Sequence, residues 1–252
     1  MVERLRSMWT IPDLRNKILY TIGMLLVFRL AAHVPVPGID PVALRNALSK
    51  NSGLNQVFGL LDVFSGGSFQ TTFSVVAMGV YPYITASIVV QLLQQIVPRL
   101  QTLSTEGESG RNRLAQITRY LTVPLALLQA FGQIAILVRA NALSTAQFGL
   151  FNAQTVIPSL AILVSLTAGT VFLVWLGELI TENGIGNGVS LIIFAGIVSR
   201  LPQAVGSQLV STSGGAGGGS NASIVSIALL AGLGLALIWL MVFVYQAQRR
   251  VP

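Results

Sequence analysis

The chain has 252 residues, of which 53% are hydrophobic and only 9% are charged. An average soluble domain carries roughly 25% charged residues, so this composition excludes a soluble protein of this size. The apolar residues form continuous runs, which predicts an all-α membrane protein built as a polytopic bundle of transmembrane helices. The charged residues that give the net charge of +7 lie between these runs. This position indicates a role in setting the orientation in the membrane and contacting lipid headgroups, rather than nucleic acid binding.

Six apolar runs are expected to cross the membrane. A helix needs roughly 20 apolar residues to cross the hydrocarbon core, so the first and fifth runs are short and are expected to be sheltered by neighbours. The expected spans lie within residues 18–34, 71–97, 120–138, 156–177, 185–197 and 224–245.

A shorter apolar stretch, about residues 54–66, precedes the second run. Gly66 and Gly67 are expected to end it as a helix of roughly three turns, about 17 Å long, which cannot span. From the residues alone, an amphipathic helix lying on the outer membrane surface is favoured. Its apolar stripe at helical spacing consists of Leu54, Val57, Phe58, Leu61 and Phe64.

The second run has a polar flank beside an apolar ridge. Val80, Ile84 and Ile88 recur every four residues, which places them along one helical ridge. Periodicity alone favours ordinary packing or lipid contact for this ridge. The neighbouring Thr85 and Gln91 suit a face that is sometimes wet.

The sequence offers little for catalysis. His33 is the only histidine and cysteine is absent, so neither a metal site nor a nucleophile pair can be completed. No acidic residue lies mid-span, which argues against a proton-coupled carrier, and Glu178 is expected to be solvated at a helix end. We therefore expect no enzyme, no catalytic or metal-binding residues and no cofactor.

The stretch "GELITENGIGNGVS", residues 177–190, contains closely spaced glycines. Phosphate binding is disfavoured because no strand precedes the glycines and no lysine follows them. The expected structure is a helix stopped by Gly184 as the C′ residue, followed by a tight turn and immediate re-entry into the membrane.

Two other connections have different compositions. Residues 99–113 mix glycine with both signs of charge and are expected to form an exposed, hydrated loop. Residues 206–223 are expected to form a flexible external connector, because glycine and serine dominate their second half. The expected organisation is residues 1–205 with five spans, this connector, and residues 224–252 with the sixth span and the start of a basic cytoplasmic loop.

Basic residues predict the orientation, because cytoplasmic loops are enriched in lysine and arginine. If the spans alternate, both termini lie on the more basic side and are cytoplasmic. The more basic side carries Arg4, Arg6, Arg15, Lys17, Arg99, Arg111, Arg113, Arg119, Arg249 and Arg250, against Arg45, Lys50, Arg139 and Arg200 on the other side.

Several segments, in order along the chain, resemble the SecY family of bacterial protein-conducting channels. They include "PVPGID", "FSGGSF", "GVYPYITASIVVQLL", "EGESGRNR", "TRYLTVPLA", "GTVFLVWLGELITENGIGNGVSLIIFAGIV" and "QRRVP". The resemblance covers about residues 13–252. The family has ten spans in two pseudo-symmetric halves, so the resemblance implies the N-terminal half of such a channel plus one further span, as the N-terminal portion of a longer protein.

The resemblance also implies roles for particular residues. An apolar pore ring matches Val80, Ile84, Val189 and Ile193, and two of the four are valine where isoleucine is common, so the ring is expected to be slightly wider. The stretch 54–66 matches the plug, a short helix that stoppers the pore, with Asp62 on its wet side.

Gate and partner contacts follow from the same resemblance. Thr85 and Gln129 match the lateral gate. The expected contacts with cytoplasmic partners are Arg111, Arg113, Arg249 and Arg250. The implied partners are the small membrane subunits SecE and SecG, the SecA motor or a ribosome, unfolded secretory and membrane proteins, and the C-terminal remainder of the channel. The implied location is the plasma (inner) membrane.

Two other classes of function stay open at this point. One is a half-size solute transporter that acts as a dimer, which an acidic mid-span residue would favour. The other is a membrane-insertion scaffold without a pore. Single-channel conductance separates both from a protein-conducting channel.

Overall fold

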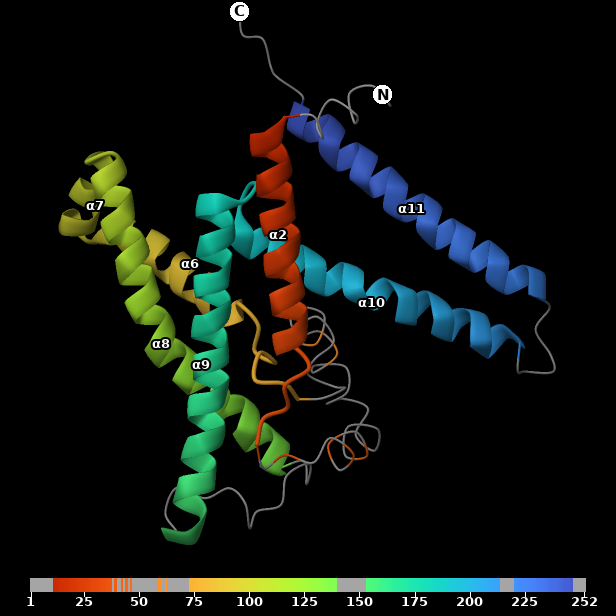
Figure 1. Ribbon diagram of the computed structural model, residues 1–252, viewed down its shortest axis with the longest axis horizontal. Coiled ribbons are helices and arrows are strands. Elements are labelled where there is room, and N and C mark those ends of the chain that lie inside the picture. The colour runs from red at the N-terminus through yellow and green to blue at the C-terminus, as the bar shows by residue number, and fades with distance from the viewer. Residues whose placement is uncertain are drawn as a thin grey trace, which may run out of the picture. The chain divides into compact units, whose positions relative to one another are not determined.

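The computed structural model describes residues 11–37, 39, 42, 44, 46, 59, 62, 73–139, 153–213 and 220–246. All named elements in this part of the chain are α-helices (Figure 1). They are α2 (Pro12–Ala31), α6 (Tyr81–Ile96), α7 (Pro98–Thr105), α8 (Glu108–Arg139), α9 (Ala153–Asn183), α10 (Gly188–Ser213) and α11 (Ser220–Gln246). The chain divides into two compact units, Met1–Ser199 and Arg200–Pro252.

Two of the described helices are long and apolar enough to cross a membrane. They are α8 and the Thr155–Asn183 part of α9, while Gly188–Arg200 and Gly232–Gln246 form shorter apolar helices. Each long helix carries an internal proline, Pro124 in α8 and Pro158 in α9. Membrane helices tolerate such prolines when neighbouring groups satisfy the freed carbonyls.

The second expected span begins later than its apolar sequence suggests. Residues 75–80 form turns, and α6 covers 16 residues from Tyr81 to Ile96. Gly79 adopts a positive φ of 60°, which a helix does not allow and glycine permits at low cost. Pro82 then lies in the first turn of α6, where its missing N–H removes no helical hydrogen bond.

The expectation of a hydrated loop at residues 99–113 was wrong in conformation. This segment contains α7 and the first turns of α8, joined at Gly107, which has a φ of 79°. The hydroxyls of Thr102, Ser104 and Thr105 donate hydrogen bonds to carbonyls three residues back. The segment is nevertheless mostly exposed. Its charged side chains therefore contact solvent, as expected, but from two helices joined by a turn.

The expected connector, residues 206–223, is also more helical than its composition suggests. The α10 helix runs to Ser213 and α11 begins at Ser220, so 206–213 and 220–223 are helical. The glycines concentrate at 214–219, outside the described residues. Because glycine is a poor helix former, the ends of the two helices flank the glycine run.

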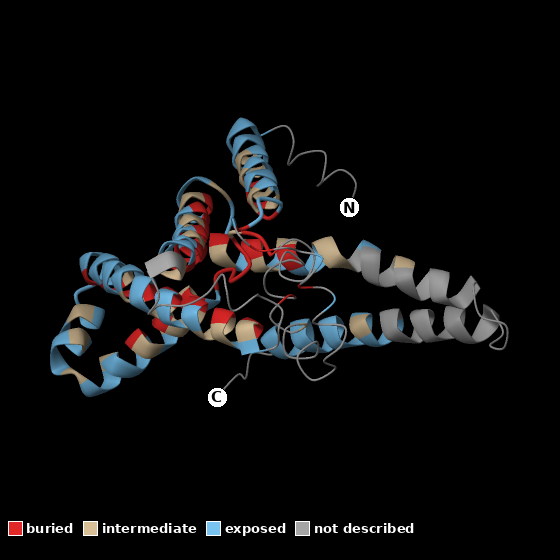
Figure 2. Cartoon of the chain, turned by 90° about the horizontal axis from the view of Figure 1, so that it is seen from below, coloured by how far each residue is buried: buried red, intermediate tan, exposed pale blue. Residues whose placement is uncertain are grey.

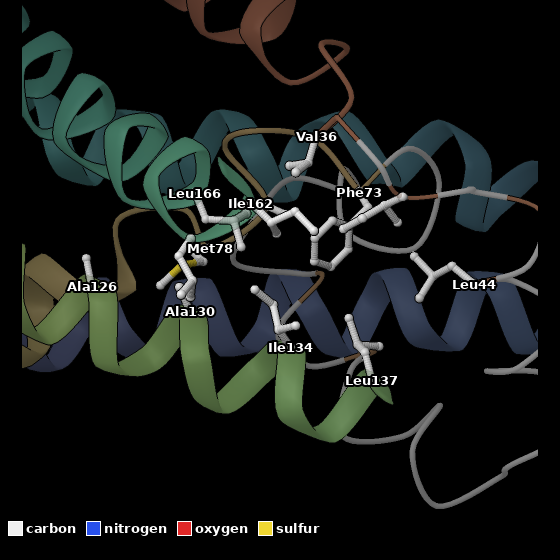
Figure 3. Close-up of a cluster of buried hydrophobic side chains, with 13 residues drawn as sticks. Val36, Leu44, Phe73, Met78, Ala126, Ala130, Ile134, Leu137, Ile162 and Leu166 are labelled. Carbon is white, nitrogen blue, oxygen red and sulfur yellow. The ribbon is translucent and has the colours of Figure 1, made fainter. Parts of the chain in front are cut away.

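A buried apolar cluster joins α8 and α9 to the segments that precede α6 (Figure 3). Phe73 is fully buried and directs its ring between Val36 and Ile134. The rest of the cluster comprises Ile39, Leu44, Ala77, Met78, Ala126, Ala130, Leu137, Ile162, Leu163 and Leu166. On α8 these side chains recur about every four residues, which places them on one face.

A short antiparallel pairing fixes the chain just before α6. Pro35 and Ser74 form an isolated bridge. The Val36 N–H donates to the Phe73 carbonyl at 3.0 Å, and the Val75 N–H donates to the Val34 carbonyl at 2.9 Å. On the other side, α9 approaches so closely that a Cβ at Gly169 would collide with the Val75 carbonyl. The entry to α6 is therefore held from two sides.

Exposed residues make up much of the described chain, and buried residues lie among them on the helices (Figure 2). Many of the exposed residues are large and apolar. Leu30 is 71% exposed, Leu128 is 70% exposed and Ile157 is 77% exposed. Apolar surface on this scale marks contact with lipid or with other proteins. It agrees with the membrane character that the composition predicts.

Candidate functional site

The four residues matched to a pore ring lie in one apolar cluster, which we call the ring cluster. Val80 is 2% exposed at the start of α6. Ile84, one turn later, and Val189 and Ile193 of α10 are partly buried against the same cluster. Its buried members are Phe28, Ala32, Val76, Val80, Leu173, Leu176, Ile180 and Ile192. The structure thus brings together side chains from α6 and α10 that are far apart in the sequence.

The third residue of the α6 ridge lies outside the ring cluster. Ile88 is 51% exposed, whereas Val80 is buried and Ile84 is half-buried. The four-residue spacing predicted a common ridge but could not indicate where along the ridge packing ends. That limit is set by α9 and α10, which the α6 sequence does not encode.

The turn between α9 and α10 positions Val189. The α9 helix ends at Asn183, directly before Gly184, as expected. The residue of the turn with a left-handed backbone is Gly186, with a φ of 70°. Gly184 donates its N–H to the Ile180 carbonyl at 2.8 Å. The Gly188 N–H donates to the Thr181 hydroxyl at 2.9 Å. These hydrogen bonds satisfy backbone groups that helix ends leave without partners.

The start of α10 lies in close contact with α9. A Cβ at Gly188 would collide with the carbonyl of Gly177. A Cβ at Gly177 would lie 3.0 Å from Cγ2 of Val189. The two glycines therefore let the backbones meet where Val189 joins the ring cluster, as small residues do between membrane helices.

The α2 helix contacts the same turn through Thr21. The Thr21 hydroxyl donates to the Lys17 carbonyl at 2.8 Å and accepts the Ile185 N–H at 3.3 Å. A Cβ at Gly184 would lie 2.6 Å from this hydroxyl oxygen. The α9–α10 turn is thus held by α2 as well as by its own hydrogen bonds.

The residues matched to a lateral gate lie on α6 and α8, two helices that pack against each other. Thr85 is half-buried and donates its hydroxyl to the Tyr81 carbonyl at 3.1 Å. Gln129 is half-buried on α8. Within the described residues, the side-chain oxygens of Gln129 and Gln133 are buried and accept no hydrogen bond. This part of α8 therefore offers polar atoms that its own fold leaves unsatisfied.

Other candidate residues are placed only in part. Leu54, Val57, Phe58, Leu61 and Phe64 of the plug stretch lie outside the described residues, as do Arg249 and Arg250. Arg111 and Arg113 are exposed near the start of α8. Asp62 is fully buried, so the expectation that it faces water was wrong.

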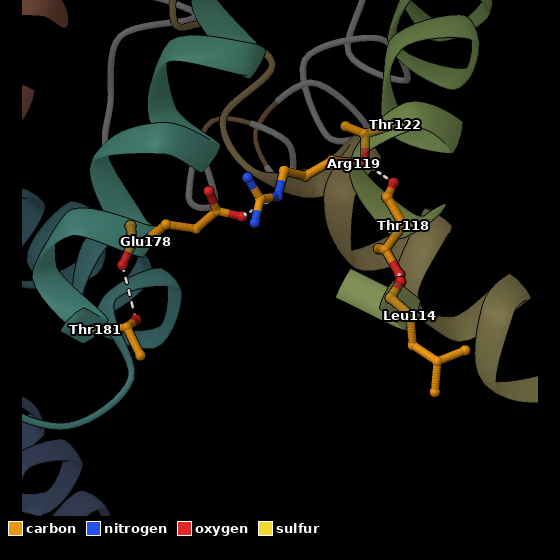
Figure 4. A network of polar contacts seen from close by, with 7 residues as sticks. Leu114, Thr118, Arg119, Thr122, Glu178 and Thr181 are labelled. Atoms are coloured by element: carbon orange, nitrogen blue, oxygen red, sulfur yellow. Dashed lines mark hydrogen bonds and ion pairs between the residues drawn. The ribbon is translucent and has the colours of Figure 1, made fainter. Parts of the chain in front are cut away.

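An ion pair joins α8 to α9 (Figure 4). The Nε atom of Arg119 lies 2.8 Å from Oε1 of Glu178, and the Glu178 side chain is only 24% exposed. The expectation of a solvated Glu178 was therefore wrong. Sequence reasoning missed the pair because its members lie on different helices, and no local spacing connects them.

The described residues contain no group of three or more histidine, cysteine, aspartate or glutamate side chains that could hold a metal ion. His33 is exposed, and its Nδ1 lies 2.7 Å from the Arg29 carbonyl oxygen. The candidate residues are mainly apolar side chains held together by contacts between helices.

These helices and apolar faces define the class of the chain as an all-α, polytopic membrane protein. Residues 74–252 match the SecY protein family. The chain is 40% identical over 96% of its length to the protein translocase subunit SecY of Streptomyces scabiei. It is 42% identical over 95% of its length to that of Corynebacterium glutamicum. The chain belongs to the SecY family.

The chain spans about half the length of the curated relatives it matches, 54% of the Streptomyces scabiei protein and 52% of the Corynebacterium glutamicum protein. A solved structure of Sec61 in the canine ribosome-channel complex from the endoplasmic reticulum matches with a TM-score of 0.54 and 18% identity. That match covers 94% of this chain and 49% of the canine chain. It supports the helical fold class at the level of architecture.

Membership in this family of translocase subunits confirms the resemblance and the all-α fold class inferred from the sequence. It also agrees with the expected membrane character, and the curated relatives carry the name protein translocase subunit.

Proposed function

We propose that this chain forms the N-terminal half, plus one further span, of a channel that passes unfolded polypeptides across the membrane and releases hydrophobic segments into lipid. The observation that carries the proposal is the ring cluster. It unites Val80 and Ile84 of α6 with Val189 and Ile193 of α10 in an apolar environment.

Apolar side chains suit such a pore for two physical reasons. A narrow hydrophobic constriction dewets, which blocks ions without any fixed charge. Apolar side chains also hold no particular sequence strongly, so an unfolded chain of arbitrary composition can slide past them. The four residues contribute one side of the constriction, and the C-terminal remainder of the channel supplies the other.

The remaining assignments belong to the same proposal. Residues 54–66 act as the plug, with Leu54, Val57, Phe58, Leu61 and Phe64 toward the ring. Thr85 and Gln129 line the lateral gate. Residues 1–205 form the half-channel, 206–223 link it to the sixth span, and 224–252 begin the next cytoplasmic loop. The unsatisfied side-chain oxygen of Gln129 supports a face that contacts water or a passing chain.

We assign the channel to the plasma (inner) membrane, with both termini of this chain in the cytoplasm. Its partners are the small subunits SecE and SecG, and a SecA motor or a ribosome. Support for a cytosolic partner comes from the exposure of Arg111 and Arg113. The related canine Sec61 was solved in a ribosome-channel complex, which supports the ribosome as one candidate.

The proposal is tested by adding polarity to the ring. Ile193→Asn, in a complete channel carrying this sequence, retains most of the side-chain bulk and should hydrate the constriction. We expect a higher resting ion leak in planar bilayers than with the unmodified channel. Ile88→Asn serves as the matched control, because Ile88 is exposed and lies outside the ring cluster. Equal leak from both variants would remove Ile193 from the ring.

A further inference from the structure

The end of α9, residues 177–183, contacts two helices at adjacent positions. Gly177 lies against Gly188 and Val189 at the start of α10. The next residue, Glu178, forms the 2.8 Å ion pair with Arg119 of α8 (Figure 4). Successive helical residues point about 100° apart, because the helix has 3.6 residues per turn. One turn of α9 therefore meets α10 on one side and α8 on another.

On the α10 side, α9 and α10 are closely packed. A Cβ at Gly188 would overlap the Gly177 carbonyl, and a Cβ at Gly177 would lie 3.0 Å from Cγ2 of Val189, closer than ordinary van der Waals contact. In addition, the Gly188 N–H is bonded to the Thr181 hydroxyl. Close-packed interiors transmit small displacements rather than absorbing them. Val189 must therefore move with the end of α9.

On the α8 side, an open apolar groove lies close to the ion pair. An apolar hollow of about 590 Å³ opens between α8 and α9. Val123, one turn after Arg119, lines it from α8, and Trp175, three residues before Glu178, lines it from α9. Side chains that line this hollow lack partner atoms on one side, so they do not fix the distance between α8 and α9 there. The Arg119–Glu178 pair therefore bridges the two helices where side-chain packing does not.

We propose that Glu178 is a positioning residue for the pore ring. Its ion pair with Arg119 holds the end of α9 at a fixed distance from α8, and the tight contact between Gly177 and Gly188 passes that position to Val189. This inference rests on the proposed function, because it assumes that Val189 and Ile193 line the pore.

The pair lies at the protein surface with both side chains only partly buried, 50% exposed for Arg119 and 24% for Glu178. Ion pairs near the surface contribute little to global stability, so the expected effect is on position rather than on folding. Glu178→Gln and Arg119→Gln, each in a complete channel, should raise the resting leak about 3-fold, in the range of measured exposed pair couplings. The charge-reversed double variant, Arg119→Glu with Glu178→Arg, should return the leak to near the unmodified value. Glu182→Gln is the matched control, since Glu182 is an exposed carboxylate one turn further along α9.

A second readout reports on geometry and does not depend on channel function. The chain contains no cysteine, so nitroxide labels can be attached at Tyr120 of α8 and Asn183 of α9, both exposed. The distance distribution between the labels should broaden in the full chain with Glu178→Gln. It should narrow again in the charge-reversed double variant.

The outcomes separate this inference from the proposed function. If Ile193→Asn raises the resting ion leak but Glu178→Gln and Arg119→Gln do not, the inference is overturned and the proposed pore ring still stands. If Ile193→Asn does not leak, the ring itself is wrong and the inference falls with it, whatever the label distances show. Leak in the double variant equal to that of the single variants overturns the inference too, because the attraction between the charges is then not the cause. An unchanged label distance in Glu178→Gln has the same consequence.

Discussion

At the scale of single residues, glycines decide how closely α10 approaches α9. Gly188 has no space for a Cβ atom beside the Gly177 carbonyl, whereas a Cβ at Gly132 of α8 would meet no atom within 4 Å. The same residue type therefore has opposite consequences at the two positions. At Gly188 it permits contact between two backbones, and at Gly132 it only lowers helix propensity.

This contrast predicts opposite effects of the same substitution. Gly188→Ala should lower the free energy of unfolding by about 1–3 kcal/mol, because the added methyl forces α10 away from α9. Gly132→Ala should leave it unchanged or raise it by up to about 1 kcal/mol through better helix propensity. Thermal unfolding of the purified protein in detergent measures both. A Gly188→Ala variant as stable as Gly132→Ala would mean that α10 does not lie against α9 in this way.

At the scale of elements, two of the six expected spans coincide with described helices long and apolar enough to cross a membrane, α8 and most of α9, whereas the short connections were predicted poorly. The α8 and α9 helices match expected spans because an apolar run of this length has few alternatives to a helix. The α6 helix lies within the expected range 71–97, but its first residue could not be located from the sequence, because residues 75–80 are as apolar as the helix that follows. Their turns depend on Gly79 and on pairing with residues 34–36, which no local pattern reveals.

The candidate site likewise contains residues that the sequence predicted and contacts that it did not. The resemblance of short segments to a known family pointed to Val80, Ile84, Val189 and Ile193. The ion pair between Arg119 and Glu178 was not foreseen. Contacts between helices depend on their relative rotation and distance, which sequence spacing within one helix does not encode.

The corner between α7 and α8 provides a test at this scale. A Cβ at Gly110 would collide with the Leu103 carbonyl, so Gly110→Ala should displace α7 from α8. We expect faster proteolysis within residues 99–107 of the variant, with no change in the membrane-spanning fragments. Gly132→Ala, on the same helix, is the control. Identical cleavage patterns in the two variants would argue against the docked position of α7.

At the scale of the whole molecule, orientation in the membrane is the property most open to direct test. Single cysteines at Arg111 and at residue 215 should label from opposite sides, since the native chain has no cysteine. We expect the first to react from the cytoplasm and the second only from outside, as the distribution of basic residues predicts. Reaction of a cysteine at residue 215 from the cytoplasm would reverse the proposed topology.

A second whole-molecule prediction concerns the channel as an assembly. The proposed ring residues come only from α6 and α10, so the 252 residues alone should not conduct polypeptide. Reconstituted into vesicles without a complementing C-terminal portion, the chain should not translocate a secretory precursor. Adding that portion should restore transport. Robust transport by the chain alone would show that its own residues complete the pore.

The pairing of residues 34–36 with 73–75 has a consequence for everything between them. Because Val36 is bonded to Phe73 and Val34 to Val75, the chain that contains residues 54–66 starts and ends at the same place. A segment tied in this way has an effective concentration on the order of millimolar at its own binding site. If residues 54–66 act as the proposed plug and leave the pore, they return by an intramolecular step whose rate is independent of protein concentration. The proposed channel would then reseal after each passing polypeptide without recruiting another molecule.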